Sequence, residues 1–331
     1  MILSIVVVNW NTRDCLLRCL ASLRHASWEG EKEIVVVDNA SADDSVAAVR
    51  SAFPEVRVVA NQTNRGFAGG VNDGIAVSTG ECVLILNPDI MVGKETLVSL
   101  AAAIQTLPYA GAVTPRLVND DGSMQCEYLR KLPSVPQVML FSTMLAQWAR
   151  HRPGLVSRYL LSVLPEDGDP HEIEQIPGAF VFTTRAVITQ TRGFDESFKL
   201  FYEDVDWSFR VRGLGLRLYL VPMVVATHSG GKSFTPRNAV WLHARFQRSL
   251  LHFFQLHASG WASAAVRVIL VENALLSAAY HLLVRPFTRG ARRAAETIAV
   301  NKHLRTLSAM LTPDTAALES WPKLSSRPPE G

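Results

Sequence analysis

Short apolar runs rich in valine and isoleucine alternate with segments of helical spacing in the N-terminal part of the chain. The runs cover residues 3–8, 33–37, 56–60 and 82–86. Such alternation predicts β-α-β units with parallel strands. Apolar residues dominate each run rather than occupying every second position, which is typical of strands that helices cover on both faces. The pattern therefore predicts an α/β fold with a doubly wound sheet.

The segment between the first two runs carries a clear helical pattern. Leucines recur there at three- and four-residue intervals, at Leu16, Leu17, Leu20 and Leu23. Asn11 and Thr12 precede them and are of the residue types that cap helix N-termini. We therefore expect a helix that begins behind these two side chains and packs its leucines on the sheet.

The pattern changes further along the chain. It is less regular from residue 108 to 177, and a second ordered block covers 176–234. From Trp241 onward the chain turns helical and more basic. The last segment, 312–331, contains several prolines and serines and is predicted to be a disordered tail.

Composition and charge narrow the class of protein. Of the 331 residues, 48% are hydrophobic and 19% are charged, which allows a sizeable core. The net charge of +3 is too small to indicate nucleic-acid binding, and no nucleic-acid partner is expected. The four cysteines form no CxxC pair, which is typical of reduced thiols in a cytosolic setting. The N-terminal run lacks a basic region and a cleavage site, so we expect a strand rather than a signal peptide.

Polar side chains follow directly on the apolar runs. Asn9 follows the first run, Asp38 the second, and Asn87 to Asp89 the fourth, within LILNPDI. Ligands of such sheets collect at the carboxyl ends of the strands. A carboxylate there suits Mg²⁺ or Mn²⁺, which bind few protein oxygens together with substrate phosphates. Asn-Pro-Asp is also good turn chemistry, so Asp89 is either a metal ligand or a turn residue.

Acids crowd the segment GFDESFKLFYEDVDWSFRVRG. They are Asp195, Glu196, Glu203, Asp204 and Asp206. Carboxylates held among aromatic side chains can have a raised pKa, as a general base working near neutral pH requires. The alternative is structural: Asp204 and Asp206 cap the following helix, while Arg210 and Arg212 pair with the acids.

Two further segments carry candidate chemistry. His228 follows an apolar run and precedes a glycine pair, and it is either a metal ligand or a satisfied structural group. The segment NQTNRGFAGGVNDGI contains Asn64, Gly66 and Asn72, and its glycines and helix N-terminus can accommodate a nucleotide. Its spacing is not the GxGxxG fingerprint, so a nicotinamide or flavin enzyme is disfavoured.

Eight segments occur in an order typical of one enzyme family. They are SIVVVNWN, EIVVVDNASADDS, NRGFAGGVNDGI, LILNPDI, IPGAF, RGFDESF, FYEDVDWSFR and THSGGKS. Together they resemble the inverting family 2 glycosyltransferases, most of all the rhamnosyltransferase branch. The resemblance implies a GT-A fold with a mixed sheet and a C-terminal helical appendage, and a divalent cation, Mg²⁺ or Mn²⁺. It further implies transfer of a sugar, with rhamnose as one candidate, from a dTDP- or UDP-sugar to a saccharide or lipid-linked acceptor in surface polysaccharide synthesis.

The resemblance also implies a nucleotide-sugar site. Its residues are Asn9, Asp38, Asn64, Gly66, Asn72, Asn87 and Asp89. Within it, Asp38 would contact the nucleobase. Asp89 matches the last acid of the family's D-x-D motif and would bind the metal, with His228 as a second metal ligand. Asn87 stands where that motif has its other acid, so one carboxylate is missing.

The catalytic base implied by the resemblance is Asp204, with Glu203 as the competing assignment. The catalytic domain would then cover residues 1–236. Its nucleotide-binding half would end at about residue 107, and its acceptor half would cover about 108–236.

The remaining segment, 237–311, is predicted to be helical and basic. Arg267, Glu272 and His281 interrupt its apolar stretch, so no window reaches the roughly 18 uncharged residues of a spanning helix. An apolar helix beside a basic cluster is the pattern of a segment that lies on an anionic membrane surface. The alternatives are a helical subdomain packed on the core and a homodimer interface. The expected location is the cytoplasm, including the inner face of the cell membrane.

Two rival functions compete with sugar transfer. A sugar-nucleotide pyrophosphorylase usually carries a glycine-rich loop after the first strand, which VNWNTRD lacks. A non-catalytic carbohydrate- or lipid-binding scaffold would not need the acids of residues 203–206. Both features favour a transferase.

Overall fold

The structure is a computed structural model that describes the chain except residues 126–128, 144, 160–167, 231–237 and 312–331. The tail predicted at 312–331 thus lies outside the described residues. The strands are β1 (Leu3–Asn9), β2 (Lys32–Asp38), β3 (Arg57–Ala60), β4 (Cys82–Leu86), β5 (Ile90–Val92), β6 (Ala110–Val118), β7 (His171–Ile173), β8 (Phe180–Thr184) and β9 (Arg217–His228). The helices are α1 (Arg13–His25), α2 (Ser45–Ala52), α3 (Gly66–Ala76), α4 (Thr96–Thr106), α5 (Val135–Phe141), α6 (Ala146–Arg150), α7 (Pro153–Tyr159), α8 (Arg185–Thr191), α9 (Glu203–Gly213), α10 (Ala239–His257), α11 (Gly260–Val284), the 3₁₀ helix η3 (Arg285–Phe287) and α12 (Gly290–Leu311).

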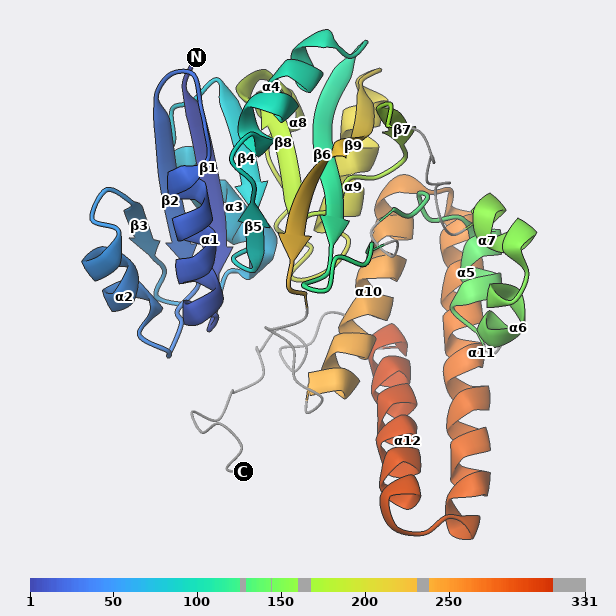
Figure 1. The fold of residues 1–331 in the computed structure, drawn as a ribbon. Helices are drawn as coiled ribbons and strands as arrows, with labels where there is room; N and C mark the ends of the chain where they lie inside the picture. The colour runs from blue at the N-terminus through green and yellow to red at the C-terminus, as the bar shows by residue number, and fades with distance from the viewer. Residues whose placement is uncertain (126–128, 144, 160–167, 231–237, 312–331) are drawn as a thin grey trace.

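The described strands form one nine-stranded mixed sheet (Figure 1). Its order is β3-β2-β1-β4-β8-β6-β9-β5, and β7 pairs with β9 outside this path. Strands β1 to β4 run parallel, as the apolar runs predict. Strand β8 enters antiparallel between β4 and β6, which makes the sheet mixed. The carboxyl ends of β1 and β4 therefore lie side by side, and the polar residues that follow them meet at one edge.

Helices cover both faces of the sheet. Ile5 and Val7 of β1 belong to a core cluster that includes the buried leucines of α1. Val6 and Val8 point to the opposite face and pack with residues of α3, α8 and α9. Gly74 of α3 lies so close to Val6 that a Cβ there would overlap the valine side chain. This packing on two sides fixes the carboxyl end of β1, where Asn9 lies.

The three C-terminal helices form a helical part beside the sheet, and α11 and α12 make a long hairpin that extends away from it (Figure 1). The hydrophobic core of this helical part contains residues of α10, α11 and α12, together with Phe198 and Val205 from the segment around the start of α9. Gly260–Phe287, with a mean hydropathy of 1.5, is long and apolar enough to cross a membrane by length and composition. One third of its most apolar window is buried within the protein. Arg267 and Glu272, which interrupt the apolar stretch, thus do not remove Gly260–Phe287 from the candidates for a spanning segment.

Candidate active site

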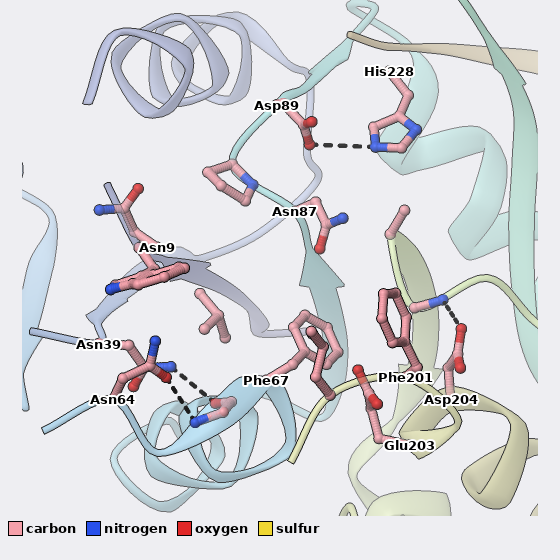
Figure 2. Close-up of a pocket in the computed structure, with 17 residues that line it drawn as sticks. Asn9, Asn39, Asn64, Phe67, Asn87, Asp89, Phe201, Glu203, Asp204 and His228 are labelled. Atoms are coloured by element: carbon pink, nitrogen blue, oxygen red, sulfur yellow. Dashed lines mark hydrogen bonds and ion pairs between the residues drawn. The ribbon is translucent and has the colours of Figure 1, made fainter. Parts of the chain in front are cut away.

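A cavity of about 410 Å³ lies at the carboxyl ends of β1 and β4 (Figure 2). Its lining includes Asn9, Asn39, Asn64, Gly66, Asn87, Asp89, Phe201, Glu203, Asp204 and His228. Residues that lie far apart in the sequence, from the end of β1 to the end of β9, thus line one cavity. Of the predicted site residues, Asp38 and Asn72 do not line this cavity.

Asn9 is held by a network of buried hydrogen bonds. Its Nδ2 donates to Asp38 Oδ1 at 2.8 Å, and its Oδ1 accepts from Thr12 Oγ1 at 2.7 Å. Asp38 Oδ2 accepts from the backbone N–H of Ser41 at 2.9 Å. Thr12 occupies the N-cap position of α1, but its side chain makes no capping hydrogen bond, so the predicted cap is wrong and Thr12 instead orients Asn9. Asp38 is 2% exposed, and its contact with the nucleobase stays a prediction.

Two further asparagines lie on the same side of the cavity as Asn9 (Figure 2). Asn39 Nδ2 donates to the carbonyl of Gly66 at 2.8 Å, and Asn64 Oδ1 accepts from the N–H of Gly66 at 2.8 Å. Gly66 has a φ of +79°, and a Cβ there would overlap the carbonyl of Lys199, so this turn requires glycine. Sequence reasoning missed Asn39, although it directly follows Asp38 at the end of β2.

Asn72 lies in α3 and does not line the cavity. Its Nδ2 donates to the carbonyl of Phe194 at 2.8 Å and to Glu196 Oε1 at 3.0 Å. Its Oδ1 accepts from the N–H of Phe194 at 2.9 Å. Asn72 therefore ties α3 to the loop that precedes α9, and its predicted role in nucleotide-sugar binding stays a prediction.

Asp89 lies in the loop that leads from β4 to β5, and its carboxylate faces the ring of His228 at the end of β9 (Figure 2). Asp89 Oδ1 lies 3.3 Å from His228 Nε2. His228 Nδ1 lies 2.7 Å from Gln125 Oε1, and Gln125 Nε2 donates to Asn119 Oδ1 at 2.6 Å and to the carbonyl of His228 at 2.8 Å. Because the amide nitrogen of Gln125 already faces two oxygens, its Oε1 must accept the Nδ1 hydrogen. His228 Nε2 is then the ring nitrogen that faces Asp89.

This pair fits a hard divalent cation only as part of a larger ligand set. Ligands at about 2.1 Å in octahedral geometry lie about 3 Å apart, which matches the spacing of Asp89 Oδ1 and His228 Nε2. Among the described residues, no group of three or more histidine, cysteine, aspartate or glutamate side chains could hold a metal ion. Asn87 lines the cavity as an amide and adds no charge. Phosphate oxygens of a substrate would have to complete the ligand shell.

Glu203 and Asp204 begin α9 at the end of the cavity opposite the asparagines (Figure 2). The two preceding residues, Phe201 and Tyr202, both have positive φ, at 65° and 71°. Such a conformation is costly for bulky side chains and is found where a site requires it. The turn directs both carboxyl groups toward the cavity. Asp204 Oδ2 accepts from the N–H of Gly178 at 2.8 Å.

The two acids have unusual acidity. Burial, followed by the charge of Asp204, raises the pKa of Glu203 to about 8. Burial also raises the pKa of Asp204, although the backbone N–H groups of Gly178 and Val205 act in the opposite direction. Burial thus favours the protonated form of both carboxyl groups, and the two N–H groups favour the ionised form of Asp204.

The alternative structural role of the acids, helix capping and pairing with arginines, is confirmed only for the pairing of Asp206 with Arg210. Asp206 is 1% exposed, and its carboxylate lies 2.7 Å from Arg210 Nη2 and 2.6 Å from His257 Nε2. Arg212 pairs instead with Glu172. Helix α9 begins at Glu203 without a side-chain cap, so capping by Asp204 or Asp206 is wrong.

Comparison with known proteins gives the family. Residues 4–157 match the family described as "Glycosyl transferase family 2". The chain is also 28% identical to the N-acetylglucosaminyl-diphospho-decaprenol L-rhamnosyltransferase of Mycobacterium tuberculosis, over 91% of this chain and 99% of that protein. Residues 4–157 of this chain are thus similar to glycosyl transferase family 2. The glycosyltransferase is also 26% identical to the low-salt glycan biosynthesis hexosyltransferase Agl10 of Haloferax volcanii, over 69% of this chain and 67% of the other.

Solved structures give the fold. The mannosyltransferase PcManGT of Pyrobaculum calidifontis, in complex with GDP-Man and Mn²⁺, matches with a TM-score of 0.53 and 17% identity, over 92% of this chain and 86% of that chain. TarS of S. aureus matches with a TM-score of 0.50 and 17% identity, over 94% of this chain and 55% of the other. The predicted GT-A fold and the predicted family are confirmed.

Proposed function

We propose that this glycosyltransferase moves a sugar from a dTDP- or UDP-sugar to a hydroxyl of a lipid-linked saccharide, with inversion at the anomeric carbon. The observation that carries the proposal is one cavity with Asp89 and His228 at one end and Glu203 and Asp204 at another. Rhamnose is the first candidate sugar, because the M. tuberculosis relative is named an L-rhamnosyltransferase of a diphospho-decaprenol acceptor.

The asparagine side of the cavity would hold the nucleoside. Asn9, Asn39 and Asn64 line it and are fixed by hydrogen bonds to neighbouring groups. Amides that cannot turn are suited to recognise the edges of a base or a ribose, because each presents its donor or acceptor in one direction.

Asp89 and His228 would hold the divalent cation together with the diphosphate of the donor. When bound, Mg²⁺ or Mn²⁺ would neutralise the charge that develops on the departing nucleoside diphosphate. The chain's own contribution is orientation: Gln125 fixes the ring of His228, and the pairing of Ile90 with His228 between β5 and β9 keeps Asp89 nearby.

Asp204 would be the general base, and Glu203 stays the competing assignment. Two backbone N–H groups favour the ionised form of Asp204, whereas the raised pKa of about 8 keeps Glu203 mostly protonated at neutral pH. Asp204 would take the proton of the acceptor hydroxyl. The acceptor oxygen would bond to the anomeric carbon while the bond from that carbon to the diphosphate breaks, and the diphosphate leaves with the electron pair.

The helical hairpin would place the enzyme on the inner face of the cell membrane. Leu276, Leu283 and Phe287 are exposed on α11 and η3, next to the basic start of α12 at Arg292 and Arg293. Apolar and basic groups together suit an anionic lipid surface. A homodimer through the same helices is the competing explanation. High salt should release a membrane-bound enzyme from anionic vesicles, and absence of binding at both low and high salt would contradict the membrane assignment.

Two substitutions test the proposed function. Asp89→Ala and Asp204→Asn should each lower transfer from the nucleotide sugar by about a hundredfold or more, since each removes a group that acts on the reacting bonds. Asp121→Asn, which changes an exposed acid outside the cavity, is the matched control. Transfer at the parent rate by either folded active-site variant would contradict the proposal.

A further inference from the structure

A second cavity of about 750 Å³ adjoins the first at the two catalytic acids. Glu203 and Asp204 line both cavities, as does Phe201. The rest of its wall comes from the loop after β6, from α5 and α6, from the loop between β7 and β8, from the start of α9, and from α10, α11 and α12. A molecule in this space would therefore approach the acids from the helical part, while a donor approaches them from the sheet.

The lining of the second cavity is strongly cationic. It contains Arg130, Lys131, Arg150 and Lys302, and its only acids among the described residues are Glu203 and Asp204. Burial lowers the pKa of Lys302. Burial and then the charge of Lys302 lower the pKa of His243 to about 3 and that of His303 to about 4. Lys302 is thus a partly buried cation beside two neutral histidines, and a bound anion would offset the cost of burying its charge.

Another part of the lining lacks hydrogen-bond donors. Gln175, Gln247 and Glu203 are at most 8% exposed. One side-chain oxygen of each, Gln175 Oε1, Gln247 Oε1 and Glu203 Oε2, has no hydrogen-bond partner among the described residues. Buried oxygens of this kind are costly unless a donor reaches them, and sugar hydroxyls are donors of the right reach.

We propose that the second cavity binds the acceptor as a saccharide whose reducing end carries a phosphate or diphosphate. The sugar hydroxyls lie against Gln175, Gln247 and Glu203, and the anionic group lies against Lys302. This inference rests on the proposed function, because it presents the acceptor hydroxyl to Asp204. A lipid tail on the acceptor would lie along α11, because Asn273 and Ser277 of this helix line the cavity and its Leu276 and Leu283 are exposed.

Binding of short synthetic probes tests the inference. The probes are N-acetylglucosamine linked through a diphosphate to a butyl chain, the neutral butyl glycoside of the same sugar, and inorganic phosphate. Calorimetric titration should show the diphosphate probe binding about tenfold or more tightly than the neutral glycoside, as expected for charge-assisted hydrogen bonds. Lys302→Gln should remove most of that difference. Lys94→Gln, at an exposed lysine that lines neither cavity, should preserve it.

The outcomes separate this inference from the proposed function. Asp89→Ala should leave binding of the diphosphate probe unchanged, because Asp89 lines only the first cavity. Probe binding that depends on Lys302, in a protein that transfers no sugar from any nucleotide sugar, would support the cavity assignment and refute the proposed function. Two results would overturn the inference while sugar transfer, and with it the proposed function, still stands. In the first, Lys302→Gln binds the diphosphate probe as tightly as the parent does. In the second, inorganic phosphate binds the parent as tightly as the diphosphate probe does.

Discussion

Glu203 should destabilise the folded protein at neutral pH. It is 7% exposed, and its pKa is raised from 4.5 to about 8. Between these two values the folded state binds more protons than the unfolded state, so the free energy of unfolding falls as the pH rises. At pH 7 the distance from the ordinary pKa is about two and a half units, and at about 1.4 kcal/mol for each unit the cost is about 3 kcal/mol.

Glu203→Gln removes this titration. The variant should be more stable than the parent by up to about 3 kcal/mol at pH 7, and by less than about 1 kcal/mol at pH 5. Urea unfolding followed by circular dichroism at both pH values measures the difference. Glu29→Gln, at an exposed glutamate, should show no such pH-dependent gain. A variant that is equally stabilised, or destabilised, at both pH values would refute the reasoning. The same variant should retain transfer, because Asp204 is proposed as the base.

Three other substitutions test individual contacts. Gln125→Leu removes the group that orients His228 and should weaken Mn²⁺-dependent binding of UDP or dTDP by about tenfold, measured by calorimetry. Unchanged Mn²⁺ dependence would show that this orientation is not required. Gly178→Ala places a methyl group about 3.2 Å from the side chain of Asp204. It should lower kcat by about tenfold to a hundredfold with donor KM preserved, and an unchanged kcat would contradict the role of Asp204. Asp206→Asn leaves Arg210 and His257 without their buried carboxylate and should lower the free energy of unfolding by about 3 kcal/mol, whereas a loss below about 1 kcal/mol would contradict it.

The parallel half of the sheet could be predicted because its signal is local. Each of the first four apolar runs forms a strand, and the helices α1, α2 and α3 between them form the crossover connections of parallel strands. The placement of β8 between β4 and β6 has no such signal. It depends on contacts between residues such as Leu84 and Phe182 that lie far apart in the sequence.

The same contrast holds for the site. Asn9 and Asp89 could be placed from the sequence, because each directly follows an apolar run at the edge where parallel strands end. Gln125 could not, since its bond to His228 joins positions 103 residues apart. The residue type of Thr12 predicts a helix cap, but its hydroxyl donates to Asn9 Oδ1 instead. Local patterns thus identify candidate groups, and long-range packing decides what those groups contact.

The most direct test of the central claim is the effect of Mn²⁺ on nucleotide binding at Asp89. Calorimetric titration of UDP and of dTDP, with and without Mn²⁺, compares the parent with Asp89→Ala, and circular dichroism verifies that the variant is folded. If Asp89 and His228 hold a cation together with the donor diphosphate, Mn²⁺ will tighten binding of one of these nucleotides to the parent and will have little effect on the variant. Equal Mn²⁺ dependence in both proteins, or none in the parent, would contradict the account.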